Sequence, residues 1–127
     1  MNKMEKKMET KDIKARLEEL PKKIFDKEIE LLKIGDDYEE HQLRAKLIET
    51  TTGLEVAEET GTDGKKVFSN QDKRNIETKA RLDKNPVYQD LDTENKQTKR
   101  DMKTEEKLID FLKRQFRAAE GLARLGE

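Results

Sequence analysis

Two series of mainly apolar residues, each repeating every seven positions and interrupted by Lys27 and His41 in the first and by Asn95, Thr98 and Glu105 in the second, constrain the fold of this chain more than any other feature. Successive members are alternately three and four residues apart, which is typical of the narrow seam of a coiled coil. The first series consists of Ile13, Leu17, Leu20, Ile24, Lys27, Leu31, Ile34, Tyr38, His41, Ala45 and Ile48. The second consists of Tyr88, Leu91, Asn95, Thr98, Met102, Glu105, Ile109, Leu112, Phe116, Ala119 and Ala123. The two seams predict an all-α protein.

The seams are satisfied most simply by a long antiparallel helical hairpin in which each covers the other. Residues 50–69 hold three consecutive threonines and three glycines, and we expect them to form the connector, with a small β-hairpin whose strands, residues 54–56 and 66–68, flank the turn at Thr62-Asp63-Gly64. If the chain folds back at residue 60, position i on the first helix lies opposite roughly position 120 minus i on the second. This register, which is set to within about one helical turn, aligns Gly35 with Asn85-Pro86.

Helix ends divide the chain further. Pro21 suits the first turn of a helix, so we expect residues 1–20 to be a basic, partly helical lead-in and residues 21–127 to form the hairpin domain. Ser69 with Asp72 resembles a capping box that starts a helix after the connector. At Asn85-Pro86 that helix must bend or restart.

Composition bears mainly on function. The chain has 28 basic and 29 acidic residues among 127, and only 31% of its residues are apolar. This small number of apolar side chains is too low to build a thick core around a pocket. We therefore predict that the protein is not an enzyme and binds no cofactor. There is no cysteine, which excludes thiolate metal sites, and His41 is the only histidine, so we expect a seam histidine partnered by a carboxylate or exposed rather than a metal ligand.

Charges are segregated along the chain despite their near-perfect balance. On the expected register, the basic lead-in lies beside the basic stretch 96–117 at the open end of the hairpin. This end is our candidate contact for DNA or an acidic partner, although the same side chains also suit solvated helix faces that pair with nearby carboxylates. The candidate residues are Lys6, Lys7, Lys11, Lys14, Lys96, Lys99, Arg100, Lys103 and Lys107.

Apolar residues that widen the dry faces beyond what one partner helix can cover point to self-association. Phe25, Ile29 and Leu32 widen the dry face of the first helix, and Phe111 and Phe116 widen that of the last. These residues are the candidate interface of a homo-oligomer. Alternatively, the N-terminal segment or residues 70–84 cover the first group within one chain.

Three segments carry a resemblance: VFSNQDKRNIE at 67–77, RLDKNPVYQDL at 81–91 and FRAA at 116–119. They resemble small helical proteins of unknown function from bacteriophages and mobile elements, which often accompany replication and recombination genes. Paired long helices are also similar in architecture to the host-nuclease-inhibitor family of phages. No apolar run in the chain is long enough to cross a membrane, and no signal peptide follows Met1. We therefore expect a cytoplasmic protein, in the host cytoplasm if it is phage-encoded.

The resemblance and the charges lead to three functional hypotheses. The first is a non-enzymatic accessory protein of DNA replication or recombination that binds DNA or a DNA-processing protein. The second is an inhibitor whose acidic arm, residues 26–59, binds a host nuclease or defence protein. The third is a structural coiled-coil component of a virion.

Overall fold

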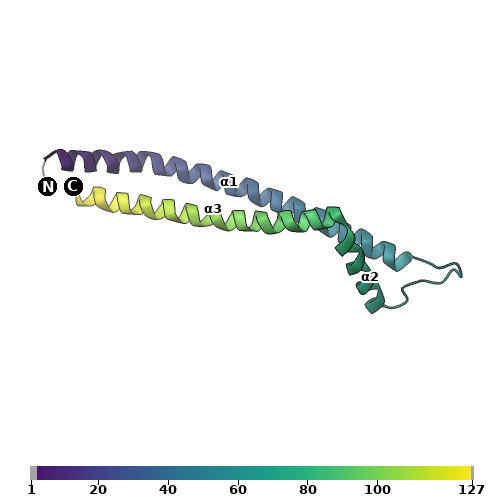
Figure 1. Ribbon diagram of the computed structural model, residues 1–127. Coiled ribbons are helices and arrows are strands. Elements are labelled where there is room, and N and C mark those ends of the chain that lie inside the picture. The colour runs from purple at the N-terminus through teal and green to yellow at the C-terminus, as the bar shows by residue number, and fades with distance from the viewer. Residues whose placement is uncertain (1–2, 127) are drawn as a thin grey trace. The chain divides into compact units, whose positions relative to one another are not determined.

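The computed structural model is all-helical, and it describes the backbone of residues 3–126 and the side chains of residues 10–126. Helix α1 spans Lys3–Glu58, α2 spans Gln71–Lys84 and α3 spans Pro86–Leu125 (Figure 1). Within the described range there is no β-strand, only an isolated antiparallel bridge between Thr60 and Lys66. The predicted all-α class is confirmed.

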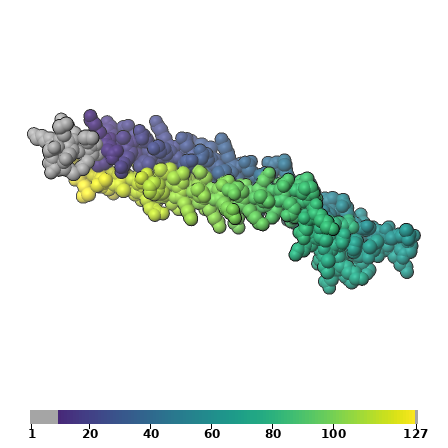
Figure 2. Space-filling view, viewed as in Figure 1, coloured from purple at the N-terminus to yellow at the C-terminus, as the bar shows by residue number. Residues whose placement is uncertain are grey.

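The helices form two compact units. Unit 1 combines Met1–Gly35 with Arg100–Glu127, and unit 2 is Asp36–Lys99. In unit 1, α1 and α3 run antiparallel and side by side, with Lys113 Nζ 3.4 Å from Glu28 Oε1 (Figure 2). In unit 2, they are also antiparallel, and His41 Nε2 lies 3.5 Å from Glu94 Oε2.

Both predicted seams are the faces that the helices turn away from solvent. Every position of the two series is buried or half-buried, and the most enclosed are Leu20, Leu91, Ile109 and Ala119. This burial supplies the hydrophobic stabilisation of the helix pairs, because most other positions on α1 and α3 are exposed.

The predicted helix start at Pro21 is wrong, because α1 passes through Pro21 without ending. Proline has no N–H, so the carbonyl of Leu17 loses its helical partner. Pro21 is exposed, so the defect lies on the solvent side of the helix and not in the seam. Leu20 and Ile24 on either side belong to one continuous seam, which holds the helix together across the defect.

The connector is shorter than the predicted residues 50–69. Helix α1 continues to Glu58 because Thr52 and Val56 extend its buried face, with exposed fractions of 8% and 0%. The predicted β-hairpin is therefore wrong for residues 54–56, which are helical. The loop of residues 59–70 turns at Gly64, whose φ of 76° favours glycine.

Helix α2 begins one residue later than the predicted capping box. Asn70, not Ser69, is the N-cap, and its Oδ1 accepts a hydrogen bond from the backbone N–H of Lys73 at 2.9 Å. Asp72 lies in the first turn, where its charge suits the helix dipole.

The predicted break at Asn85-Pro86 is confirmed. Asn85 ends α2, and its side-chain Oδ1 accepts hydrogen bonds from the N–H groups of Val87 and Tyr88 at the start of α3. Pro86 occupies the first helical position, where no N–H is needed. Gln89 Nε2 also donates to the carbonyl of Leu82 at 3.0 Å, which ties the end of α2 to the start of α3.

The predicted register is wrong. Tyr88, three residues after Asn85, donates a hydrogen bond to Glu49, so Gly35 cannot lie opposite Asn85-Pro86. The cause is α2, which is set at an angle to α1 and α3 within unit 2 instead of running straight along α1 (Figure 1). The returning chain therefore uses more residues before it rejoins the seam.

We predict that Pro21→Ala stabilises the protein. Alanine restores the N–H that the carbonyl of Leu17 lacks, so the free energy of unfolding should rise by about 2 kcal/mol. Urea unfolding monitored by circular dichroism measures the change. Pro86→Ala is the matched control, since proline at the first helical position breaks no hydrogen bond. Equal effects of the two substitutions would contradict the explanation given for Pro21.

Candidate functional site

The nine predicted cationic residues are divided between the two units. Lys11 and Lys14 on α1 and Arg100, Lys103 and Lys107 on α3 belong to unit 1. Lys96 and Lys99 belong to unit 2, and Lys96 pairs with Asp92 at 3.0 Å. The side chains of Lys6 and Lys7 lie outside the described residues. The changed register explains this distribution, because the end of α3, not residues 96–107, lies beside Lys14.

Lys14 instead lies next to the C-terminal turns of α3. It lines an open groove of about 250 Å³ together with Thr10, Ile13, Leu17, Leu122, Ala123 and Gly126. Arg124 follows Ala123 directly, and Arg117 is seven residues earlier on the same helix face. These two arginines were missed by the sequence analysis, although their seven-residue spacing is visible there.

Seam geometry places these cations on one edge of unit 1. The ion pair between Glu28 and Lys113 marks that edge. Lys14 is two heptads before Glu28, and Arg117 is four residues after Lys113, so both project on the same side of the seam. We define the basic edge as Lys11, Lys14, Arg117 and Arg124, all of which are exposed.

The charge of each unit agrees with this placement. Unit 1 holds 17 basic and 14 acidic residues, a net charge of +3, and unit 2 holds 11 basic and 15 acidic residues, a net charge of −4. The basic edge also includes Glu18 and Glu120, which reduce its potential. The segregation predicted from the sequence thus follows the two units.

Polar residues interrupt the seam of each unit. In unit 1, Lys27 Nζ lies 3.0 Å from Glu30 and 3.8 Å from Glu105, and the hydrogen bond to Glu30 is the main cause that raises the pKa of Lys27. In unit 2, His41 Nδ1 and Asn95 Oδ1 are buried without a hydrogen-bond partner. Such groups weaken a seam but oppose slipped alignments of the helices.

His41 is a seam histidine beside a carboxylate, as the sequence analysis predicts. Its Nε2 faces Glu94 at 3.5 Å. Among the residues that the structure describes, no group of three or more His, Asp or Glu side chains is arranged to hold a metal ion.

A second open groove, of about 390 Å³, lies along unit 2. Its lining residues are Gln42, Ala45, Lys46, Glu49, Tyr88, Asp92 and Asn95. The hydroxyl of Tyr88 donates to Glu49 there. This hydrogen bond, with burial as the smaller cause, raises the pKa of Tyr88 to about 12.

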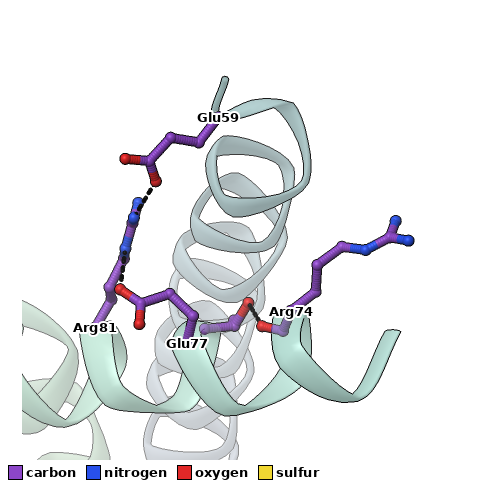
Figure 3. Close-up of polar contacts among 5 residues, drawn as sticks. Glu59, Arg74, Glu77 and Arg81 are labelled. Carbon is purple, nitrogen blue, oxygen red and sulfur yellow. Dashed lines mark hydrogen bonds and ion pairs between the residues drawn. The ribbon is translucent and has the colours of Figure 1, made fainter. Parts of the chain in front are cut away.

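Arg81 fastens α2 to the end of α1. Its guanidinium donates to Glu77 Oε1 at 2.9 Å and also to Glu59, the first residue after α1 (Figure 3). The same group lies 5.8 Å from the centre of the Phe68 ring, within the range of a cation–π interaction. The Arg81 side chain thus joins α2 to both ends of the loop, at Glu59 and at Phe68.

The predicted interface residues fall on different surfaces of unit 1. Phe25 and Leu32 are 61% and 69% exposed and lie on the Glu28 edge with half-buried Ile29. Phe111 is 53% exposed but lies two residues before Lys113, about 200° around the helix and so toward the other edge. Phe116 is half-buried in the seam. They do not form one continuous surface.

Comparison with known protein families, curated proteins and solved structures found no match. Across the described part of the chain, no helix combines the length and the apolar character that a membrane span requires.

We predict that Tyr88 titrates well above an ordinary tyrosine. In Tyr38→Phe, Tyr88 is the one remaining tyrosine, and its phenol should ionise with a pKa of about 12, followed by ultraviolet absorbance. Because the folded pKa lies above the unfolded value of about 10, the stabilisation from this group is complete below pH 10 and is lost as the pH rises toward 12. Adding Glu49→Gln should lower the pKa, and an unchanged titration would contradict the assigned cause.

Proposed function

We propose that this protein is a non-enzymatic accessory protein that binds DNA through the basic edge of unit 1. The proposal is supported by four exposed cations, Lys11, Lys14, Arg117 and Arg124, which the heptad spacing assigns to one edge of the helix pair. Lysine and arginine side chains in a row bind phosphates and release the counterions that surround DNA.

The form of this edge favours backbone contacts over base recognition. Arg117 and Arg124 are seven residues apart, so they are about 10 Å apart along the helix axis, a distance that spans a few phosphates of one strand. Phosphate contacts position a protein on DNA but carry no sequence information. We therefore expect weak, salt-dependent binding with little sequence preference, reduced further by Glu18 and Glu120.

Replication and recombination modules of phages or mobile elements, the setting implied by the resemblance, suit such an activity. The net charge of −4 on unit 2 favours a second candidate, in which this unit binds a basic DNA-processing or host defence protein. The two candidates use different units and can be separated by mutation.

We predict that DNA affinity falls steeply with salt and depends on the basic edge. Fluorescence anisotropy with a labelled duplex measures the binding constant K, and the slope of log K against the logarithm of the salt concentration is then compared between variants. The double variant Lys14→Gln/Arg124→Gln should make that slope shallower by about 2, because two phosphate contacts are lost. Lys66→Gln with Lys79→Gln, an equal charge change at exposed positions of unit 2, is the matched control. Absence of binding at low salt, or equal losses in both variants, would rule out the proposed DNA surface.

A further inference from the structure

Helix α3 carries a second heptad series beside the one in the seam. Phe111, Leu122 and Leu125 in this series are 53%, 49% and 85% exposed, so α1 does not cover them. The series lies wholly within unit 1. A helix with two such series can pack against a third helix in addition to its seam partner. We call it the α3 outer stripe, and its members, again alternately three and four residues apart, are Leu108, Phe111, Gln115, Ala118, Leu122 and Leu125.

A column of cations borders the α3 outer stripe on its solvent side. Arg100, Lys107 and Arg114 are seven residues apart, and all three are exposed. Arg114 is three residues after Phe111 and four before Ala118, so this cation column lies directly beside the stripe. Within the part of the chain that the structure describes, none of the three takes part in an ion pair. The other flank of the stripe is the seam itself, so the cation column is the flank of α3 that an added helix would meet.

Helix α1 adds positive charge on the same edge of unit 1. Arg16, Lys23 and Glu30 are seven residues apart and occupy the flank of the α1 seam opposite that of Glu28, whose ion pair with Lys113 marks the far edge. Arg16 and Glu30 are each paired with a neighbour on α1, at 3.2 Å and 3.0 Å. Lys23 between them is exposed. The flanking positions of the two helices thus hold three cations on α3 and two on α1, against one acid that is already paired.

We propose that the α3 outer stripe and the cation column together bind an acidic amphipathic helix of another protein. The apolar residues of that helix, three and four apart, pack on the stripe around Phe111 and Leu122. A column of Glu or Asp beside them meets Lys107 and Arg114. Charges that flank a heptad seam decide which helices pair, and an exposed apolar patch of this kind marks an interaction surface. The surface is distinct from the basic edge, and the proposal does not depend on DNA binding.

The charge pattern favours a different chain over a second copy of this one. Two outer stripes packed on each other would bring two cation columns together, which is unfavourable. A further exposed stripe on α1, formed by Leu43, Leu47 and Leu54 at 69%, 67% and 56% exposure, is flanked by Arg44 on one side and Lys46 on the other. These cations interrupt both of its flanks. That stripe therefore offers no continuous acidic column to match Arg100, Lys107 and Arg114.

Two synthetic helical peptides of one heptad design test the charge requirement on the intact chain. Both carry leucine at the seam positions, and the flanking positions are glutamate in one peptide and lysine in the other, so that like charges keep each peptide from pairing with itself. Fluorescence anisotropy at about 50 mM salt should show the glutamate peptide bound about tenfold more tightly or better. Lys107→Glu/Arg114→Glu should reverse the preference. Lys66→Glu/Lys79→Glu, an equal change at exposed positions of unit 2, is the matched control and should leave it unaltered.

Equal binding of the two peptides by the natural chain, or a preference that Lys107→Glu/Arg114→Glu does not change, would contradict the proposal. The variant Lys14→Gln/Arg124→Gln, which alters the basic edge, should bind the glutamate peptide as the natural chain does. Its result separates this surface from the one proposed for DNA, so either proposal can fail without the other.

Substitutions in the stripe test the apolar part of the surface. Phe111→Ser/Leu122→Ser should weaken binding of the glutamate peptide about tenfold or more, because two exposed apolar side chains no longer pack on the peptide. Ile76→Ser on α2, where Ile76 is 71% exposed, is the control. Circular dichroism should show the same helix content in both variants. An equal loss in the two would mean that the stripe is not the contact.

Two competing occupants give different results with the same variants. If anionic lipid vesicles bind the chain through Phe111 and Leu122 while the glutamate peptide does not bind, the stripe is a membrane contact and the proposal is wrong. It is also wrong if sedimentation equilibrium shows a dimer that Phe111→Ser/Leu122→Ser dissociates, since a second copy then covers the stripe.

Discussion

The packing of one narrow apolar face on another is the interaction on which the rest of this structure depends. Outside the two seam series, most side chains of α1 and α3 are exposed, and only a few apolar residues reach full burial. Helices of this kind gain most of their stability from tertiary contacts along one face. The seam therefore decides where α1 ends and how α1 tolerates Pro21.

Polar groups inside the seams give up stability for alignment. Lys27 and Glu105 interrupt unit 1, and His41 and Asn95 interrupt unit 2, with an unpaired buried nitrogen on His41 and an unpaired buried oxygen on Asn95. An apolar seam alone allows helices to slide by a heptad at little cost. A slip would separate Lys27 from Glu105 and place other groups against His41, so each polar position opposes wrong registers.

Local sequence patterns predicted which faces of α1 and α3 are buried, but not the register in which α3 packs against α1. Heptad spacing identified the buried face of both long helices, and Asn85-Pro86 identified the break, because both signals act within a few residues. Pro21 and the Thr50–Gly53 stretch misled the prediction, since the seam overrides weak local propensity there. The register depended on the direction of α2, which is set by tertiary contacts of Arg81 with Glu59 and Phe68. Because the predicted register was wrong, the sequence analysis placed residues 96–107 beside Lys14 and did not identify Arg117 and Arg124 at the end of α3.

The two connections of unit 2 differ in how they respond to a change of chain length. The loop of residues 59–70 is exposed except at Phe68, so an extra residue at its turn can be accommodated locally while Glu59 and Phe68 keep their contacts with Arg81. Asn85 is a one-residue joint whose side chain caps α3 while Gln89 binds back to Leu82. One residue added at this joint would turn α2 by about 100° relative to α3 and carry Arg81 away from Glu59. Insertions and deletions in this protein should therefore be concentrated at the loop. The joint at Asn85 should keep its length, because its length sets the rotation of α2 about its axis relative to α3.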